Sequence, residues 1–234
     1  MSRARHDDES RSARPVRAVW SVRDSRNPGT IGWMSTQTVE LFYAILALLA
    51  VGAVATLVVI RLLAIQSEAA RGWYGAIAQF VGPNAIGMAF WVALLATMGS
   101  LYFSEIAHFE PCKLCWFQRI AMYPLVVLLG IAAVRRDDGI RIYGRAISAI
   151  GAAIALYHVA LEWIPALDTG ACGTGPACSI IWFRVLGFIS LPTLSLVAFL
   201  FIFTLLSVRD PDAGSEADGT DAGTTAASHD RSPA

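Results

Sequence analysis

The sequence predicts an all-α integral membrane protein, a four-helix bundle with one extra N-terminal transmembrane helix. Of its 234 residues, 56% are apolar and only 15% are charged, whereas soluble globular chains carry about 25% charged residues. Long apolar stretches alternate with short polar loops. The formal net charge is zero and the arginines are scattered, which argues against the basic patch typical of nucleic-acid binding.

Each apolar stretch can cross a hydrocarbon core of about 30 Å as a helix. The first, 41–60, has no charge and forms the centre of the extra helix, 39–65. Gly82-Pro83 interrupts the second stretch, so we expect an interfacial linker over 66–83 and a new helix from Asn84. The spans of the four-helix core, residues 84–207, are expected at 84–104, 116–134, 146–164 and 185–206, the last one bent at Pro192.

Both ends of the chain are polar. Residues 1–38 are rich in Arg, Ser and Asp, and residues 208–234 are rich in Asp, Gly, Ser, Thr and Ala. Such segments bury too little apolar surface to offset the entropy lost on ordering. We therefore expect both ends to be disordered.

The distribution of charge orients the bundle, because cytoplasmic loops of membrane proteins carry an excess of Lys and Arg. The loop 135–145 has four arginines against two aspartates and is expected in the cytoplasm. The loops 105–115 and 165–181 together have one lysine against three acidic residues, and they contain all four cysteines. Both cysteine pairs are therefore expected on the extracytoplasmic, oxidising side.

The extra helix conflicts with this orientation. If Asn84 starts on the cytoplasmic side, the first helix starts outside, yet seven arginines precede it. One hypothesis is that translation starts at Met34, because then only Glu40 flanks the helix on the outside, while Arg61 and Arg71 follow it inside. The alternative is a topology that satisfies the charge rule incompletely.

The first cysteine pair is a Cys-x-x-Cys, formed by Cys112 and Cys115 where a helix is expected to begin at the outer face. Sulfurs at this spacing can close a small, reversible disulfide. A helix N-terminus and the cations Lys113 and Arg119 favour the thiolate, which is the reactive species. Arg119 lies about one helical turn after Cys115, inside the membrane, where an arginine marks a functional site by default. Its charge is suited to stabilise a negative acceptor such as a reduced quinone.

The second pair, Cys172 and Cys178, lies in a short loop rich in glycine. Because little else there fixes a fold, we expect an exposed disulfide that is accessible to the thiol of a partner protein. Thiol–disulfide exchange transfers electrons from one pair to another. Two pairs on one face of the membrane therefore predict a relay.

Two alternatives remain for the cysteines. Four thiolates could hold a structural zinc ion, or both pairs could be inert structural disulfides. An oxidising location and the intramembrane Arg119 argue against zinc, so we expect no metal. A Cys-x-x-Cys disulfide closes too small a loop to stabilise a fold appreciably, which argues against a purely structural role.

Two histidines are further candidates. His108, one turn before Cys112, is expected with Glu105 either to relay protons to a quinone or to form a solvated cap at the interface. His158 and Glu162 have i, i+4 spacing and share one face near the outer end of the fourth span. There they either pair with each other or take part in function.

Three tryptophans, Trp116, Trp163 and Trp182, fall at the expected outer boundaries of the helices. This placement is typical of the aromatic belt of membrane proteins. Trp116, next to Cys115, is also a candidate to flank a quinone.

The stretches 104–124 and 178–192 resemble the disulfide bond formation protein B (DsbB) family, and most closely its BdbC-like branch. The likeness covers about residues 84–207 and includes the demanding pattern Pro-Cys-x-Leu-Cys-x-x-Gln-Arg from Pro111 to Arg119. It implies a four-helix bundle in the bacterial cell membrane. Such proteins are dithiol:quinone oxidoreductases that reoxidise an extracytoplasmic thioredoxin-fold (DsbA-like) thiol oxidase and pass the electrons to ubiquinone or menaquinone.

By position, the resemblance implies that Cys172 forms the mixed disulfide with the partner, that Cys115 is the thiolate facing the quinone, and that Arg119 is the quinone-side arginine. Vitamin K epoxide reductase-like proteins use a similar bundle, but their loop cysteines precede the Cys-x-x-Cys. The chain departs from the DsbB pattern in its extra helix and in the close spacing of Cys172 and Cys178. These departures leave open the role of the extra helix and the order of exchange.

Two rival functions stay open. One is a membrane scaffold with structural disulfides or zinc, in which the thiols do not cycle. The other is a reductase that carries electrons outward from a quinol, because direction depends on the potentials of the quinone and of the partner.

Overall fold

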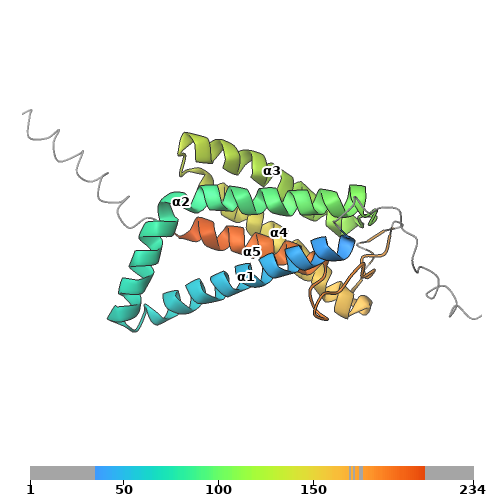
Figure 1. Cartoon of the computed structure of the whole chain (residues 1–234), viewed down its shortest axis with the longest axis horizontal. Coiled ribbons are helices and arrows are strands. Elements are labelled where there is room, and N and C mark those ends of the chain that lie inside the picture. The colour runs from blue at the N-terminus through green and yellow to red at the C-terminus, as the bar shows by residue number, and fades with distance from the viewer. Residues whose placement is uncertain (1–34, 169, 171, 174–175, 209–234) are drawn as a thin grey trace, which may run out of the picture. The chain divides into compact units, whose positions relative to one another are not determined.

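The computed structural model describes residues 35–168, 170, 172–173 and 176–208, and these contain helices but no β-strand (Figure 1). The α-helices are α1 (Thr36–Leu63), α2 (Glu68–Leu101), α3 (Lys113–Arg135), α4 (Ile140–Trp163) and α5 (Leu191–Ser207). A π-helical turn, η2 (Tyr102–Ile106), continues α2, and a 3-10 turn, η3 (Pro165–Leu167), follows α4. The helices α1 to α4, with η2 included in the second, are long and apolar enough to cross a membrane. The predicted all-α membrane architecture is confirmed.

The predicted disordered ends lie almost wholly outside the described residues. Where the two overlap, the structure is ordered. α1 begins at Thr36, so residues 36–38 are helical. Val208, predicted as the first residue of the tail, is 3% exposed and buried at the end of α5.

The predicted break at Gly82-Pro83 is wrong, because α2 continues through it from Glu68 to Leu101. Figure 1 shows α2 bent into a short first arm and a longer second arm. Proline removes one backbone hydrogen bond and bends a helix, and the side chain of Asn84 donates to the carbonyl of Phe80 at 3.0 Å within this turn. The segment 66–83, predicted as a linker, is therefore mostly the first arm of a helix; its interfacial position stays a prediction.

The last span is shorter than predicted. α5 begins at Leu191 rather than Val185, and Pro192 lies in its first turn instead of bending its centre. Proline is well tolerated there, because the first N–H groups of a helix have no partner within it. Residues 185–190 instead form a tight turn in which Val185 and Ile189 pair as an isolated β-bridge. With 17 residues, α5 is about 25 Å long.

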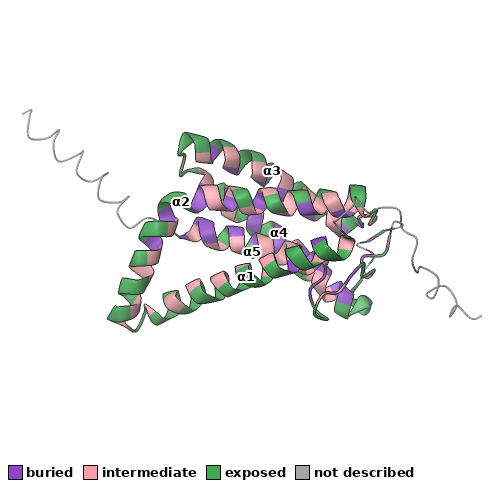
Figure 2. Ribbon diagram, viewed as in Figure 1, coloured by how far each residue is buried: buried purple, intermediate pink, exposed green. Residues whose placement is uncertain are grey.

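α2, α3, α4 and α5 pack around one apolar core (Figure 2). Small residues let the helices approach closely, as is common in membranes. A Cβ on Gly151 of α4 would overlap the ring of Phe199 on α5, and one on Gly144 would lie 2.6 Å from Leu206. The largest fully buried side chains of this core are Leu125, Leu129, Phe199, Ile202, Leu205 and Leu206.

α1 packs against both α5 and α2. Its first turns lie at the cysteine-bearing end of the bundle, because Val39 clusters there with Phe103 and Phe183. Near its other end, Arg61 donates to the hydroxyl of Tyr74 on the first arm of α2 at 2.8 Å. The extra helix therefore starts at the same end as the cysteine loops.

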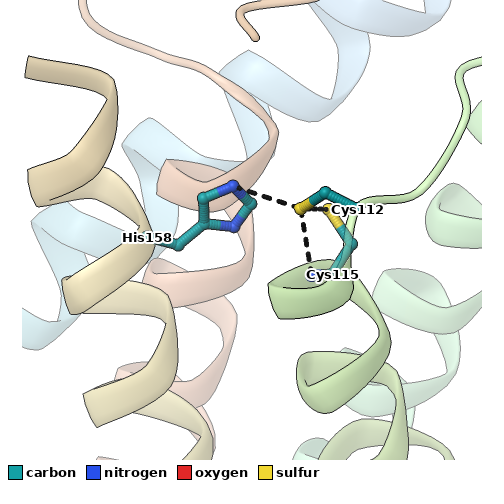
Figure 3. A group of neighbouring side chains, drawn as sticks. All are labelled: Cys112, Cys115 and His158. Carbon is teal, nitrogen blue, oxygen red and sulfur yellow. Dashed lines mark hydrogen bonds between the residues drawn. The ribbon is translucent and has the colours of Figure 1, made fainter. Parts of the chain in front are cut away.

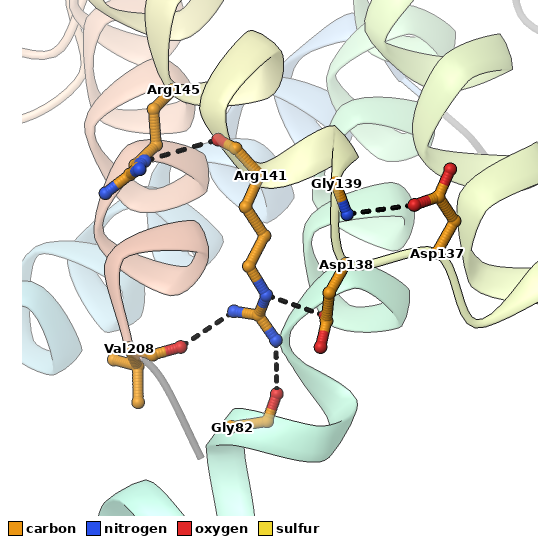
Figure 4. A network of polar contacts seen from close by, with 7 residues as sticks. All are labelled: Gly82, Asp137, Asp138, Gly139, Arg141, Arg145 and Val208. Atoms are coloured by element: carbon orange, nitrogen blue, oxygen red, sulfur yellow. Dashed lines mark hydrogen bonds and ion pairs between the residues drawn. The ribbon is translucent and has the colours of Figure 1, made fainter. Parts of the chain in front are cut away.

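Arg141 ties three elements together at the opposite end (Figure 4). Its guanidinium donates to the carbonyl of Gly82 at the bend of α2 and to the carbonyl of Val208 after α5, both at 2.7 Å. It also pairs with Asp138 at 2.8 Å. The residue is only 9% exposed, so it is a buried donor that joins the bend of α2 and the end of α5 to the start of α4.

Replacing Arg141 by methionine should lower the free energy of unfolding by about 2 kcal/mol or more, because two buried carbonyls lose their donor. Arg145→Met is the matched control, since within the described ranges Arg145 donates only to the carbonyl of Arg141, at 3.3 Å. Equilibrium unfolding in mixed detergent micelles measures both variants. An equal loss in the two would contradict the role assigned to Arg141.

Candidate functional site

The Cys-x-x-Cys pair lies at the start of α3 (Figure 3). Cys112 is the N-cap residue of the helix, and its sulfur accepts the backbone N–H of Cys115 at 3.5 Å. The two sulfurs lie 3.2 Å apart, so a small movement would join them. Cys112 is buried and Cys115 is half-buried.

His158 reaches this pair from α4. The amide nitrogen of Gln118 lies 3.0 Å from Nδ1 of His158, and an amide nitrogen can only donate. Nδ1 therefore accepts, and the proton of the neutral ring lies on Nε2. This atom is 3.1 Å from the carbonyl oxygen of Cys178 and 3.6 Å from the sulfur of Cys112. One N–H thus faces both cysteine pairs.

The surroundings of Cys112 favour its thiolate. The hydrogen bond with the Cys115 thiol is the main cause that lowers the pKa of Cys112 to about 4. The hydrogen bond of His158 and the backbone N–H of Cys115 add to this effect, while burial opposes it. When the pair is reduced, these contacts favour the thiolate on Cys112, whereas the resemblance implied it on Cys115.

Cys172 and Cys178 form a disulfide, with their Cα atoms 5.9 Å apart. The expectation of an exposed disulfide is wrong, because Cys172 is 4% and Cys178 only 1% exposed. Both cluster with Cys112 and with Leu114 and Leu161. The loop folds over the ends of α3 and α4, since its apolar sulfurs find an apolar surface there.

A small cavity of about 20 Å³ is lined by atoms of both pairs, namely Cys112, Cys115 and Cys178, together with His158 and Glu162. Its volume corresponds to about one water molecule. The two pairs, 57 residues apart in the sequence between Cys115 and Cys172, therefore meet at one buried point.

A second, larger cavity of about 240 Å³ begins on the other side of Cys115. Its walls come from α1, α2, α3 and α5 and are mostly apolar. Cys115 lines both cavities, whereas Cys112 lines only the small one. Cys115 is thus the sulfur that faces the large cavity.

Arg119 supplies the fixed positive charge of the large cavity. Its guanidinium donates to the hydroxyl of Ser100 at 3.0 Å and to the carbonyl of Ser100 at 3.1 Å. It also lies over the ring of Trp116, 5.2 Å from the ring centroid. No carboxylate forms an ion pair with it in the described part of the chain.

Two candidates are not brought to the cavity. His108 is exposed, with φ of 56°, and does not line either cavity. The segment before Cys112 is not helical, so the expected one-turn spacing does not apply. Trp116 is 52% exposed and contacts Arg119 from outside the lining. The lining instead includes Trp182, which stacks on Phe109 with ring centroids 4.9 Å apart.

Sequence reasoning missed Gln118, Ser100 and Tyr43 as site residues. Gln118 is buried, at 7% exposure, about one turn after Cys115. A polar amide at this position of a membrane helix could have marked it as a candidate site residue. Ser100 and Tyr43 lie on other helices, and nothing in their neighbourhood in the sequence singles them out. Glu162 does not form an ion pair with His158 among the described residues; it accepts the hydroxyl of Ser190 at 2.5 Å.

The geometry also bears on the metal alternative. The ligand atoms of Cys112, Cys115 and His158 lie within 4.8 Å of one another. A site of four thiolates would need Cys172 and Cys178 as well, but these two are joined to each other. The described residues thus offer three metal ligands at this point, whereas structural zinc sites use four.

Comparison with known proteins identifies the family. The model of the family "Disulfide bond formation protein DsbB" matches residues 83–208. Probable disulfide formation protein C 1 of Bacillus cereus is 48% identical over 122 residues, which are 50% of this chain and 86% of the relative. Disulfide bond formation protein C of Bacillus subtilis is 44% identical over 116 residues, 49% of this chain and 84% of the relative. No solved structure shows a significant match.

The matched region contains both cysteine pairs, His158 and Arg119, while α1 and the first arm of α2 lie outside it. The chain is a multi-pass helical membrane protein, and it belongs to the DsbB family of disulfide bond formation proteins, with BdbC-like relatives.

Proposed function

We propose that the protein is a dithiol:quinone oxidoreductase that reoxidises an extracytoplasmic DsbA-like thiol oxidase. The observation that supports this most directly is the position of Cys115, which lines both the small cavity shared by the two cysteine pairs and the large cavity that holds Arg119. These contacts support an electron route from the loop pair to Cys112, then to Cys115, and from there to the large cavity.

In the proposed reaction, two thiols of the partner become a disulfide and the Cys172–Cys178 disulfide becomes two thiols. These thiols then reduce the disulfide of Cys112 and Cys115 and regenerate their own bond, so two electrons and two protons move to the Cys-x-x-Cys pair. Cys178 is the loop cysteine whose carbonyl faces His158. We therefore assign Cys172 to the partner and Cys178 to the exchange with Cys112.

The reduced Cys-x-x-Cys pair is prepared for oxidation by its surroundings. The Cys112 thiolate accepts from the backbone N–H of Cys115, with the N–H of His158 nearby. When Cys112 and Cys115 join, His158 retains the carbonyl of Cys178 as acceptor. The buried ring thus has a partner in both redox states.

The large cavity fits a quinone. A quinone has a flat apolar ring and two carbonyl oxygens, and the cavity offers apolar walls with one cationic donor, Arg119, held by Ser100. A quinone bound there would supply the two-electron acceptor that reoxidises the pair. Arg119 would stabilise negative charge at that point, which a low-dielectric site strengthens, and Cys115 would be the reacting sulfur.

Cys112→Ser should abolish electron transfer to a quinone, because no disulfide can form with Cys115. The measurement is the loss of quinone absorbance after purified protein and a reduced thioredoxin-fold dithiol are mixed, with dithiol omitted as the control. Turnover by Cys112→Ser equal to that of the unmodified chain would refute the assignment. Failure of the unmodified, folded chain with both ubiquinone and menaquinone analogues would favour the scaffold or metal alternative, which bound-metal analysis then decides.

Cys178→Ala should accumulate a mixed disulfide with an oxidised DsbA-like partner. The Cys172 thiolate opens the disulfide of the partner and leaves one partner thiol free, and Cys178, which would otherwise attack the mixed disulfide and release the partner, is missing. Non-reducing electrophoresis and peptide mass spectrometry of the complex identify the cysteine involved. Cys172→Ala is the matched control and should trap no complex through the loop. A complex that forms only through Cys178 or the Cys-x-x-Cys pair would reverse the proposed order.

The low pKa of Cys112 should depend on the hydrogen bond from position 115. In Cys115→Ser the hydroxyl still donates and the thiolate should persist well below neutral pH, being lost only as pH falls through the lowered pKa. In Cys115→Ala the pKa should rise toward the ordinary value of about 8.5. Thiolate absorbance titrated against pH, with the double variant Cys112→Ser/Cys115→Ser as baseline, measures both. Coincident titration midpoints would contradict this origin of the shift.

A further inference from the structure

α1 presents two different faces. Tyr43, Leu46, Ala47 and Ala50, spaced i, i+3, i+4 and i+7, all line the large cavity. Their neighbours on the other side are apolar and exposed, for example Leu41, Ile45 and Leu49 at 53%, 49% and 67%. In a membrane such an exposed apolar face contacts lipid. One face of α1 therefore belongs to the cavity and the other to the bilayer.

The position of α1 closes the cavity on one side. α1 packs against both α2 and α5, and these two helices also line the cavity. The residues matched by the DsbB family begin only at 83, so this wall is an addition to the family's core. Without α1, the side of the cavity between α2 and α5 would face lipid directly.

Tyr43 fixes α1 in this position. Its hydroxyl donates to the carbonyl of Leu95 on α2 at 3.1 Å. Its ring lies over Gly99, where a Cβ would come within 2.6 Å of the ring, so α2 has a glycine where the ring packs. The next residue, Ser100, is the one that holds Arg119. α1 is thus anchored beside the cationic group of the cavity.

Ala47 and Ala50 leave space in the cavity wall. Both are half-buried small residues on the lining face. A large side chain at either position would project into a cavity of only about 240 Å³. The free volume next to Cys115 and Arg119 therefore depends on side chains of α1.

We infer that α1 is the lipid-side wall of the quinone site, and that the Tyr43, Leu46, Ala47 and Ala50 face determines how tightly a quinone is held. This inference rests on the proposed function, and it adds a specificity-determining surface from outside the family's matched core. A quinone bound beside Cys115 would then contact this face of α1 with its head and with the start of its tail.

The test is quinone binding to the full chain carrying Ala47→Phe, with Ala55→Phe as the matched control, because Ala55 is an exposed residue of α1 that does not line the cavity. Binding of decyl-substituted ubiquinone and menaquinone analogues is titrated through quenching of tryptophan fluorescence, since Trp182 lines the cavity. Ala47→Phe should raise the dissociation constant about tenfold or more, and Ala55→Phe less than about twofold. The KM for the dithiol partner should change in neither variant.

If Ala47→Phe does not fold, Ala50→Leu is a smaller substitution that fills the same cavity. Thermal unfolding in detergent shows whether each variant is folded. Unchanged quinone affinity in folded Ala47→Phe or Ala50→Leu, with normal binding by the unmodified chain, would overturn the role of α1 and leave the proposed function intact. An unmodified chain that binds neither quinone would overturn both.

Discussion

The hydrogen bonds of His158 fix the relative positions of the parts that the proposed relay needs. Gln118 on α3 sets the tautomer of the ring, and the remaining N–H faces the sulfur of Cys112 and the carbonyl of Cys178. One side chain of α4 thereby joins the start of α3 to the cysteine loop. In a buried apolar cluster an unpaired ring nitrogen would be costly, so these contacts hold the loop pair against the Cys-x-x-Cys pair rather than in solvent.

The loop disulfide is buried, which restricts the thiols that can reach it. A disulfide exposed in a flexible loop would react with any thiol that met it, whereas Cys172 and Cys178 are shielded by the cluster that contains Cys112. Under the proposed function, a partner would have to displace part of the loop to reach Cys172, so docking would be a condition for exchange. Selectivity for one partner follows naturally from this arrangement under the proposed function.

The two ends of the bundle are stabilised by different means. At the cysteine end, aromatic rings pack together, including Phe103, Phe109 and Trp182, and Ser190 ties the start of α5 to Glu162. At the opposite end, Arg141 supplies donors to the bend of α2 and to the chain after α5. Each arrangement satisfies polar groups where water is scarce, which membrane proteins require of their backbone. α1 lies along this framework and closes the large cavity.

The sequence by itself determined the membrane architecture, and it singled out the two cysteine pairs and Arg119 as candidates for the proposed redox centre. These follow from composition, from charge in the loops and from spacing along single helices, all of which are local. It also signalled a disturbance at Pro83, but a proline does not reveal whether a helix ends or bends. In the structure the helix bends, and Arg141, 58 residues away from Pro83, donates to the carbonyl of Gly82 at the bend.

Only the tertiary structure decided which side chains from different helices meet. It brought His158 rather than His108 to the cysteines, placed Trp182 rather than Trp116 in the cavity wall, and buried the loop disulfide. It also placed Tyr43 in the wall of the cavity that Ser100 and Arg119 line, from a helix whose sequence shows only lipid-like composition. The physical reason is the same in each case: local patterns set the faces of a helix, but the contacts across helices depend on close packing of small and large residues that are distant in the sequence.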